Sequence, residues 1–299
     1  MQKPKAKKIG KAALIFVGAI ILLFVIGVVV LLGWAKETTG RQVLDFEDKP
    51  KVSDYVDVGV KVISSDLNKK SIVVRVQIVP HGNLAEGQGL LTEKDTDLDL
   101  LAQPLTVYVS PGSQDYNRTY LPGMYMTPMD ITLDTEGEVE LYPWDDHEAN
   151  FTVFVVRPVA GGNPIPVPTR VGFEGSEPGL MLSVKLDKKR GGAEATITIL
   201  ATRSTITKAV VWFSIALIWV LAGTVAVMAL LVLRGRKLEM VMFPFAGTIL
   251  FSMVAFRNAL PGAPPIGALS DYMGAFWGYA LVTLSVVAFT VTWARRKDQ

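Results

Sequence analysis

The chain has 299 residues, of which 50% are hydrophobic and 19% are charged, and it contains no cysteine. This composition is too apolar for an ordinary soluble protein and too charged for a bundle made only of membrane helices, so it indicates a mixed architecture. The lack of cysteine excludes a disulfide framework and a thiolate zinc site.

The first segment, residues 1–35, is predicted to be a cytoplasmic tail followed by a membrane helix. Five lysines between Lys3 and Lys11 precede an uncharged apolar run at 12–32. This run supplies the roughly 20 residues that a helix needs to cross a bilayer core. A cleaved signal peptide would have an apolar core of about 7–15 residues that ends in small residues, so an uncleaved anchor is favoured. The lysines should hold the N-terminus in the cytoplasm.

The second segment, residues 36–208, is predicted to be an extracytoplasmic antiparallel β-sandwich. Apolar and polar residues alternate in several short runs that are rich in β-branched and aromatic side chains, which is typical of strands with one buried face. Short runs separated by turn signals favour a sandwich. The predicted strands lie at 56–62, 72–79, 105–109, 139–142, 151–156, 179–186 and 195–201. Residues 85–103 are expected to form an irregular excursion.

Charge supports this division of the chain. Residues 36–208 contain 18 basic and 25 acidic residues, whereas the remainder contains 12 basic and 3 acidic residues. An acidic domain outside and basic ends inside are what the positive-inside rule predicts. Nucleic-acid binding by the domain is disfavoured because phosphate contacts need a basic surface.

The third segment, residues 209–299, is predicted to hold three further membrane helices and a cytoplasmic C-terminus. Apolar runs occur at about 209–233, 240–256 and 273–293, and basic clusters follow the first and the last run. Four spans in total place both termini and the 234–237 loop inside, and the β domain and the 257–271 turn outside. The 240–256 run is the weakest because it is short and contains Pro244, although neighbouring groups can satisfy the carbonyl that a proline frees.

The turn between the last two predicted helices is a candidate functional motif. It places one cation and one anion where two helices leave the membrane, among prolines and glycines that shape the chain. Its candidate residues are Arg257, Asn258, Pro261, Pro264, Pro265, Gly267 and Asp271. Two interpretations of the charges stay open: an ion pair at the outer rim, or two side chains that are solvated separately.

A second candidate motif lies in the β domain at Tyr142, Pro143, Trp144 and Asp145. The favoured interpretation is a turn between strands, with Tyr142 and Trp144 in the core and Asp145 capping backbone amides. The motif is also similar to the aromatic-Pro-x-Asp turn in the exported domain of pentameric ligand-gated channels. Those channels have no leading span and four spans after the sandwich, whereas one span precedes it here and three follow it.

The order of one span, an exported β domain and three spans resembles the family known as domain of unknown function 4436. The resemblance is carried by residues 257–267 with Asp271-Tyr272 and Phe276-Trp277, and by residues 141–145. It extends over nearly the whole chain. It implies an envelope membrane protein, mainly actinobacterial, and no activity.

Catalytic and metal-binding patterns are scarce in the sequence. His81 and His147 are the two histidines, and no G-x-S-x-G elbow is present. The run 145–148 contains three carboxylates and a histidine, but neighbours on an extended chain point to opposite faces, so a solvated turn is favoured over a metal site. The run 95–99 has the spacing of a calcium loop without its glycine and glutamate. No cofactor is expected.

Three functions are compatible with these features. The first is a non-enzymatic envelope protein whose β domain binds a protein partner or ligand while its helices lie in the lipid bilayer as part of a larger membrane assembly. The second is a channel-like or ligand-sensing protein in which the last strand acts on the next helix. The third is an envelope hydrolase that uses His147 or Asp145.

Overall fold

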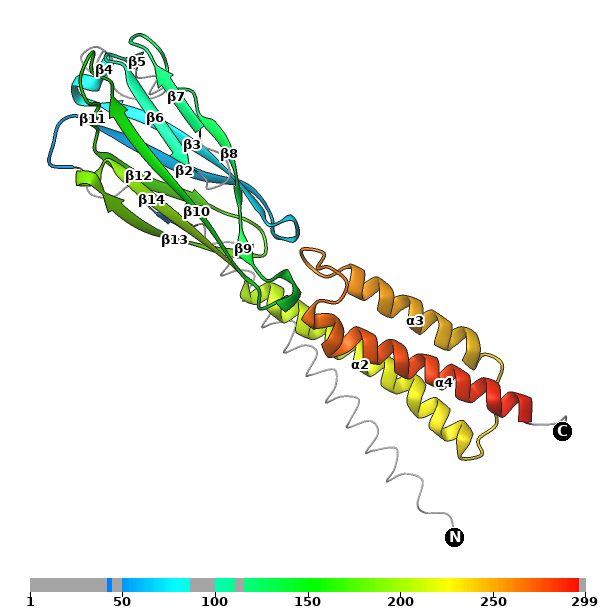
Figure 1. Cartoon of the computed structure of the whole chain (residues 1–299). Coiled ribbons are helices and arrows are strands. Elements are labelled where there is room, and N and C mark those ends of the chain that lie inside the picture. Colours follow the sequence, from blue (N-terminus) through cyan, green and yellow to red (C-terminus); the bar gives the residue numbers. More distant parts are fainter. Residues whose placement is uncertain (1–41, 45–49, 87–99, 111–115, 296–299) are drawn as a thin grey trace, which may run out of the picture.

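The computed structural model describes residues 42–44, 50–86, 100–110 and 116–295. The described part is elongated, with the strands at one end and helices α2, α3 and α4 at the other (Figure 1). The predicted N-terminal helix, the run at 95–99 and the extreme C-terminus lie outside the described residues. The described chain thus has two regions, a β domain and a helical bundle.

Two sheets make up most of the β domain. The first has the order β1 (Gln42–Leu44), β12 (Thr169–Gly175), β2 (Tyr55–Asp66), β3 (Ser71–His81) and β8 (Met129–Asp134). The second has the order β13 (Leu180–Lys189), β14 (Glu194–Arg203), β10 (Asp146–Arg157), β6 (Leu105–Ser110) and β7 (Tyr116–Tyr120), and β9 (Glu136–Gly137) and β11 (Ile165–Pro166) also pair with β10. A short ribbon joins β4 (Ala85–Glu86) to β5 (Leu100–Leu101).

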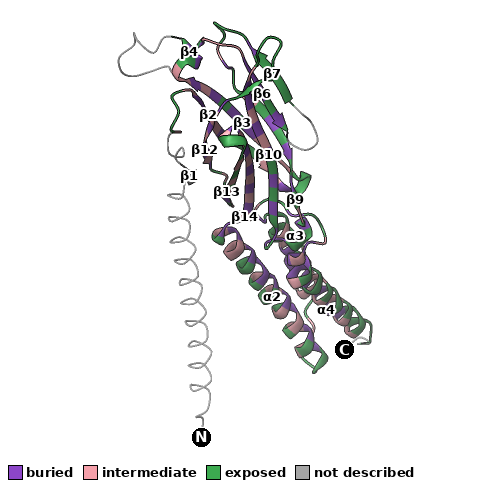
Figure 2. Cartoon of the chain, turned by 60° about the vertical axis from the view of Figure 1, so that its left-hand side comes forward, coloured by how far each residue is buried: buried purple, intermediate pink, exposed green. Residues whose placement is uncertain are grey.

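One apolar core lies between the two sheets. Strand β14 shows how the sequence builds it, because every second residue from Ala195 to Ala201 is buried and the residues between them are half-exposed. Ile72 and Val74 of β3 and Phe151 of β10 belong to the same core cluster. Figure 2 shows the resulting bands of buried and exposed residues along the strands. Alternation with period two is therefore the signal that encodes this core.

Six of the seven predicted strands are present, with longer bounds than the alternation indicated. The prediction at 139–142 was wrong, because Val139–Leu141 forms a single 3-10 turn instead. Pro143 follows this turn and has no N–H group for a sheet ladder, which explains why no strand forms there. Strands β7, β8 and β12 were missed because polar or charged residues leave each of them few apolar positions.

One pairing departs from the predicted antiparallel arrangement. Strand β12 runs parallel to β2, with Val171 opposite Val58, whereas the other strand pairs are antiparallel in the described part of the chain. Strand β12 reaches the first sheet after the chain leaves β10 in the second sheet and crosses over. The alternation of β12 defines its buried face, but it does not encode the direction of its neighbour.

Helices α2 (Thr205–Leu233), α3 (Met242–Asn258) and α4 (Phe276–Arg295) form the bundle, and a π-helical turn at Asp271–Ala275 leads into α4. Helix α2 and residues 271–295 are long and apolar enough to cross a membrane by length and composition, and α3 is shorter. The helices pack around Ala222, Met253 and Val282. A Cβ atom on Gly278 would lie 2.7 Å from Ile218 Cγ2, so this glycine permits the close approach of α2 and α4.

Candidate functional site at the junction of the β domain and the helices

The two candidate motifs meet at the junction of the β domain and the helices. The Tyr142 hydroxyl donates a hydrogen bond of 2.6 Å to the Pro261 carbonyl, across 119 positions of sequence. The Ser270 amide donates to the Tyr142 carbonyl at 3.3 Å. The Tyr142 side chain is completely buried in a small cluster that includes Val211 and Leu260. Tyr142 is therefore a core residue, as predicted, but the core in question is the junction and not the sandwich.

Burial raises the pKa of Tyr142 to about 12, with a further upward contribution from Asp145 and a downward one from Arg203. The phenol therefore stays protonated at neutral pH and can act as a hydrogen-bond donor. The Pro261 carbonyl needs such a donor because it lies in a turn and not in a helical ladder.

Trp144 does not lie in a core, contrary to the prediction. Its side chain is 37% exposed and meets Trp212 of α2 edge to face, with ring centroids 5.8 Å apart. Trp144 and Tyr142 both follow the 3-10 turn, but Trp144 is exposed whereas Tyr142 is buried. The sequence shows two aromatic residues, and only the packing of the turn against α2 separates their environments.

Asp145 forms a buried, bidentate ion pair with Arg203, the last residue of β14. Arg203 Nε lies 3.0 Å from both carboxylate oxygens, and Arg203 Nη2 lies 2.8 Å from Oδ2. The His147 Nε2 atom lies 3.0 Å from the same Oδ2. The two side chains of the ion pair are 0% and 6% exposed. Asp145 was predicted to cap backbone amides; its carboxylate does interact with its own amide, but its main partners are the side chains of Arg203 and His147.

The surroundings of Asp145 stabilise its charged form. Burial acts to raise the pKa of Asp145, but hydrogen bonds from His147 and Arg203 and the charge of Arg203 outweigh it and hold the pKa below its ordinary value. The carboxylate is thus ionised throughout the neutral range and retains its partners there.

Arg203 connects three parts of the junction. Besides pairing with Asp145, its guanidinium lies 5.0 Å from the centroid of the Tyr142 ring. A Cβ atom on Gly262 would lie 2.5 Å from Arg203 Nη1, and Gly262 has a φ of +75°, so a larger residue would be strained here and would displace the guanidinium. Ser204 follows directly and caps α2 by accepting a hydrogen bond from the Thr207 amide.

The tip of the β2–β3 hairpin makes a further connection to the helical part. The Asn68 side-chain amide donates to the carbonyls of Gly262 and Ala263 at 2.9 and 3.0 Å. In Figure 1 this hairpin reaches down to the turn that follows α3. Neither Arg203 nor Asn68 was among the predicted site residues. The one local signal for Arg203 was its position between the last strand and a capping serine.

Arg257 and Asp271 form an ion pair, which decides between the two interpretations left open by the sequence. Arg257 Nε and Nη2 lie 2.9 and 2.8 Å from the two carboxylate oxygens, and the side chains are 13% and 2% exposed. Arg257 Nη2 also donates to the carbonyls of Pro264 and Pro265, and the Gly267 amide donates to Asp271. The pair therefore holds the whole turn in shape.

The remaining predicted residues have different environments. Pro143 is buried beside Tyr142, Pro261 is half-buried, and the Asn258 side chain is exposed at the end of α3. The site is thus organised by Tyr142, Asp145 and the two arginines, and the prolines contribute mainly their carbonyl groups and their shape.

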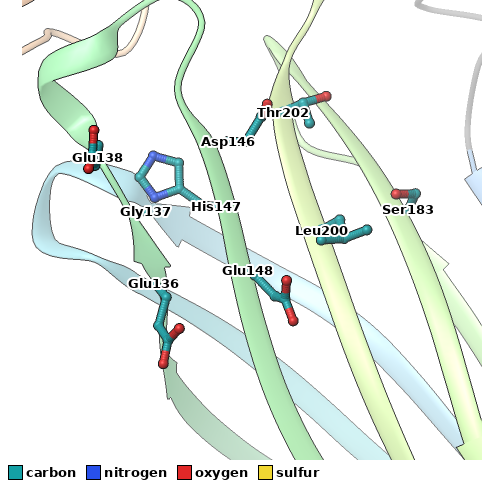
Figure 3. Close-up of a pocket in the computed structure, with 9 residues that line it drawn as sticks. All are labelled: Glu136, Gly137, Glu138, Asp146, His147, Glu148, Ser183, Leu200 and Thr202. Atoms are coloured by element: carbon teal, nitrogen blue, oxygen red, sulfur yellow. The ribbon is translucent and has the colours of Figure 1, made fainter.

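A shallow hollow of about 570 Å³ lies beside the junction on the second sheet (Figure 3). Its lining residues are Glu136, Gly137, Glu138, Asp146, His147, Glu148, Ser183, Leu200 and Thr202. Asp145 and His147 are buried together, whereas Asp146 and Glu148 are exposed. The run 145–148 is therefore not wholly the solvated turn that was predicted. Within the described residues, no group of three or more acidic or histidine side chains could hold a metal ion.

Comparison with protein families divides the chain at the junction. A family model described as Domain of unknown function (DUF4436) matches residues 46–199, and one described as Domain of unknown function (DUF8686) matches residues 203–296. The first match covers just over half of the chain, so this protein belongs to the DUF4436 family. The motif at 141–145 lies within the DUF4436 match, and the motif at 257–277 lies within the DUF8686 match. The match to DUF4436 therefore covers the β domain, whereas the sequence led us to expect a resemblance over nearly the whole chain. No curated protein matches the chain.

Proposed function

We propose that this protein is a non-enzymatic integral membrane protein of the cell envelope. Its exported β domain, residues 36–208, binds a protein partner or a ligand, and the chain acts as an accessory subunit of a membrane assembly. Four helices cross the plasma membrane, and both termini are cytoplasmic. The observation that carries the proposal is the junction, which attaches the β domain to the apolar helices through buried polar contacts.

The junction supports a role in presenting the β domain at a fixed orientation. The covalent connection at Ser204 would not by itself fix the orientation of the domain on α2. The Tyr142–Pro261 hydrogen bond, the Arg203–Gly262 approach and the Asn68 contacts come from three separate segments of the β domain. A domain held at three points keeps its far surface at a fixed distance from the helices. Less conformational entropy is then lost when a partner binds that surface.

The membrane placement rests on the helices and on the distribution of charge. Two elements are apolar and long enough to cross a bilayer, and basic residues gather at their ends opposite the β domain. A cysteine at Tyr108 should react with an impermeant thiol reagent on intact cells, and a cysteine at Lys237 should react only after lysis. Labelling of both on intact cells, or the reverse pattern, would contradict this topology.

The binding role can be tested by photo-crosslinking in intact cells. A photoreactive amino acid at Tyr108, which is 40% exposed on the β domain, should trap a distinct protein. The matched control is the same group at Val220, which is 64% exposed in the middle of α2 and should trap lipid. A chain that crosslinks to no protein from Tyr108 and purifies alone in mild detergent would overturn the binding proposal.

A ligand-sensing function is the second candidate, and one observation favours it. Strand β14 ends at Arg203 and α2 begins at Thr205, so movement of the strand acts directly on the helix. Conduction has less support. Thr224, Thr248, Ser252 and Ser285 each donate to a carbonyl of their own helix four positions earlier, so these hydroxyl protons are already used within the helices. Ion conductance of the purified protein in planar bilayers would favour the channel-like form of this function.

An envelope hydrolase has the least support. The side chain of His147 lies in the wall of the hollow but is completely buried, and its Nε2 atom is held by Asp145, so a substrate in the hollow would meet no exposed imidazole nitrogen. His81 is bound to Asp57 and stacks on Tyr55. In the part of the chain that the structure describes, neither histidine is hydrogen-bonded to a serine that could serve as the nucleophile.

A further inference from the structure

We propose that the foot of the β domain, defined as residues 139–145, lies in the headgroup layer of the bilayer and that its exposed side chains Leu141 and Trp144 contact phospholipid. This inference rests on the proposed membrane placement and goes beyond it. It makes the lipid surface a partner of the β domain as well as of the helices.

The foot exposes large apolar side chains that continue onto α2. Leu141 is 44% exposed, Trp144 is 37% exposed and Trp212 is 49% exposed. The two tryptophan rings touch, so they lie at one level of the molecule. Charged residues flank these apolar side chains: Glu140 in the foot is exposed, and Lys208 lies half-exposed one helical turn before Trp212. An apolar band bounded by charge is typical of a membrane interface.

Aromatic residues continue this level around the bundle. Tyr272 is 58% exposed in the π-helical turn, Trp277 is 61% exposed at the start of α4, and the Tyr272 ring meets Phe276 edge to face. The Trp219 indole on α2 donates to the Met273 carbonyl, which places it beside the same turn. Tryptophan and tyrosine are enriched where membrane helices cross the headgroup layer. Their position at the end of the bundle nearest the β domain marks the outer interface.

The length of the helices agrees with this level. Trp212 and Leu233 are 21 positions apart, and so are Tyr272 and Trp293. At about 1.5 Å per residue, both intervals span roughly 30 Å, which matches the hydrocarbon thickness of a bilayer. Trp293 is 58% exposed and precedes Arg295, as expected at the inner interface. With Trp212 at the outer interface, Trp144 is placed there as well.

The buried ion pairs of the junction suit a site with little water. Asp145 and Asp271 are each at most 2% exposed, and each is held by an arginine that binds both of its oxygens. A charge near lipid needs such internal partners because the surroundings provide few. A surface that contacts lipid must be apolar outside, and any charge buried beneath it must have a partner within the protein.

Spin labels can test the inference because the chain has no cysteine. Single-cysteine variants Leu141→Cys, Tyr108→Cys and Val220→Cys, each carrying a nitroxide, would be reconstituted as full chains in phosphatidylcholine–phosphatidylglycerol vesicles. Collision with oxygen, which partitions into lipid, would be compared with collision with a water-soluble nickel chelate. We expect nickel accessibility at 141 to be severalfold lower than at 108 and oxygen accessibility to be intermediate between 108 and 220.

The outcomes separate this inference from the membrane placement. If the label at 141 collides with nickel as often as the label at 108, while the label at 220 is in lipid, the foot is in water and the inference is overturned. If the label at 220 is itself in water, the membrane placement fails. Trp144→Cys gives an independent measurement of the foot, and a low nickel accessibility at both positions would support the inference.

Discussion

The Arg203–Asp145 pair lies at the base of the sandwich, whereas the Arg257–Asp271 pair closes the turn between α3 and α4. Both are bidentate and buried, and both place the arginine at or next to the end of a secondary-structure element. They differ in the sequence separation of the paired residues. The first joins residues 58 positions apart and fixes a strand end to the start of β10, and the second joins residues 14 positions apart within one turn.

The two ion pairs therefore have different structural roles at the junction. The local pair shapes the turn through the carbonyls of Pro264 and Pro265 and the Gly267 amide. The long-range pair positions the β domain so that Tyr142 can bind that turn. Disruption of the local pair should therefore affect mainly the helical side, and disruption of the long-range pair should loosen both sides.

The largest effect is expected for Arg203→Ala. The substitution leaves the Asp145 carboxylate buried with one partner, and loss of one member of a buried pair typically lowers the free energy of unfolding by about 3–5 kcal/mol. Thermal unfolding of the full chain in detergent measures this change. The matched control is Arg75→Ala, which removes an arginine from the exposed pair with Asp130 and should change stability little. Equal destabilisation by the two variants would show that the Arg203 pair has no special role.

A smaller loss is expected for Arg257→Ala or Asp271→Ala. Each should lower the free energy of unfolding by an amount near the lower end of about 3–5 kcal/mol, because Arg257 keeps some contact with solvent. The exchanged double variant Arg257→Asp with Asp271→Arg should recover only part of the loss. In the exchanged protein a carboxylate would face the carbonyls of Pro264 and Pro265, which now accept from Arg257. Full recovery, measured by heat stability, would mean that these carbonyls contribute nothing.

The Tyr142→Phe variant tests the contact between the two regions. It removes the hydroxyl that donates to the Pro261 carbonyl and leaves that carbonyl without its donor, which should cost about 1–3 kcal/mol. The ring and its packing are retained, so the effect reports the hydrogen bond alone. The control Tyr108→Phe alters an exposed hydroxyl on the same domain and should leave the unfolding midpoint unchanged. A Tyr142→Phe protein as stable as the control would argue against the contact.

The smallest effect is expected from pH in the neutral range. The folded-state pKa of Asp145 is depressed below the unfolded value of about 3.9, so its contribution to stability is complete above that value and is lost as pH falls through the folded pKa. The unfolding midpoint should thus be insensitive to Asp145 between pH 7 and 5 and should fall below pH 4. The Arg203→Ala protein should show less of this acid-induced fall. An equal fall in both proteins would mean that the pair does not set the pKa of Asp145.

The sequence by itself determined that a β region precedes the helices, and it located most of the secondary structure of the described residues. Alternation with period two located β10 and β14, and uninterrupted apolar runs located α2 and α4, because both signals depend only on neighbouring residues. The short spacing of Arg257 and Asp271 also made their pairing a defined alternative, since a proline-rich turn limits how far apart its ends can lie.

Tertiary structure alone decided which residues meet at the junction. Arg203 reaches Asp145 because β14 and β10 pair in one register, and Tyr142 reaches Pro261 because the sandwich rests on the bundle. Local patterns carry no information about contacts across such separations, because these depend on how complete elements pack against one another. The same packing placed Trp144 outside and Tyr142 inside, although the sequence presents them two positions apart on one turn.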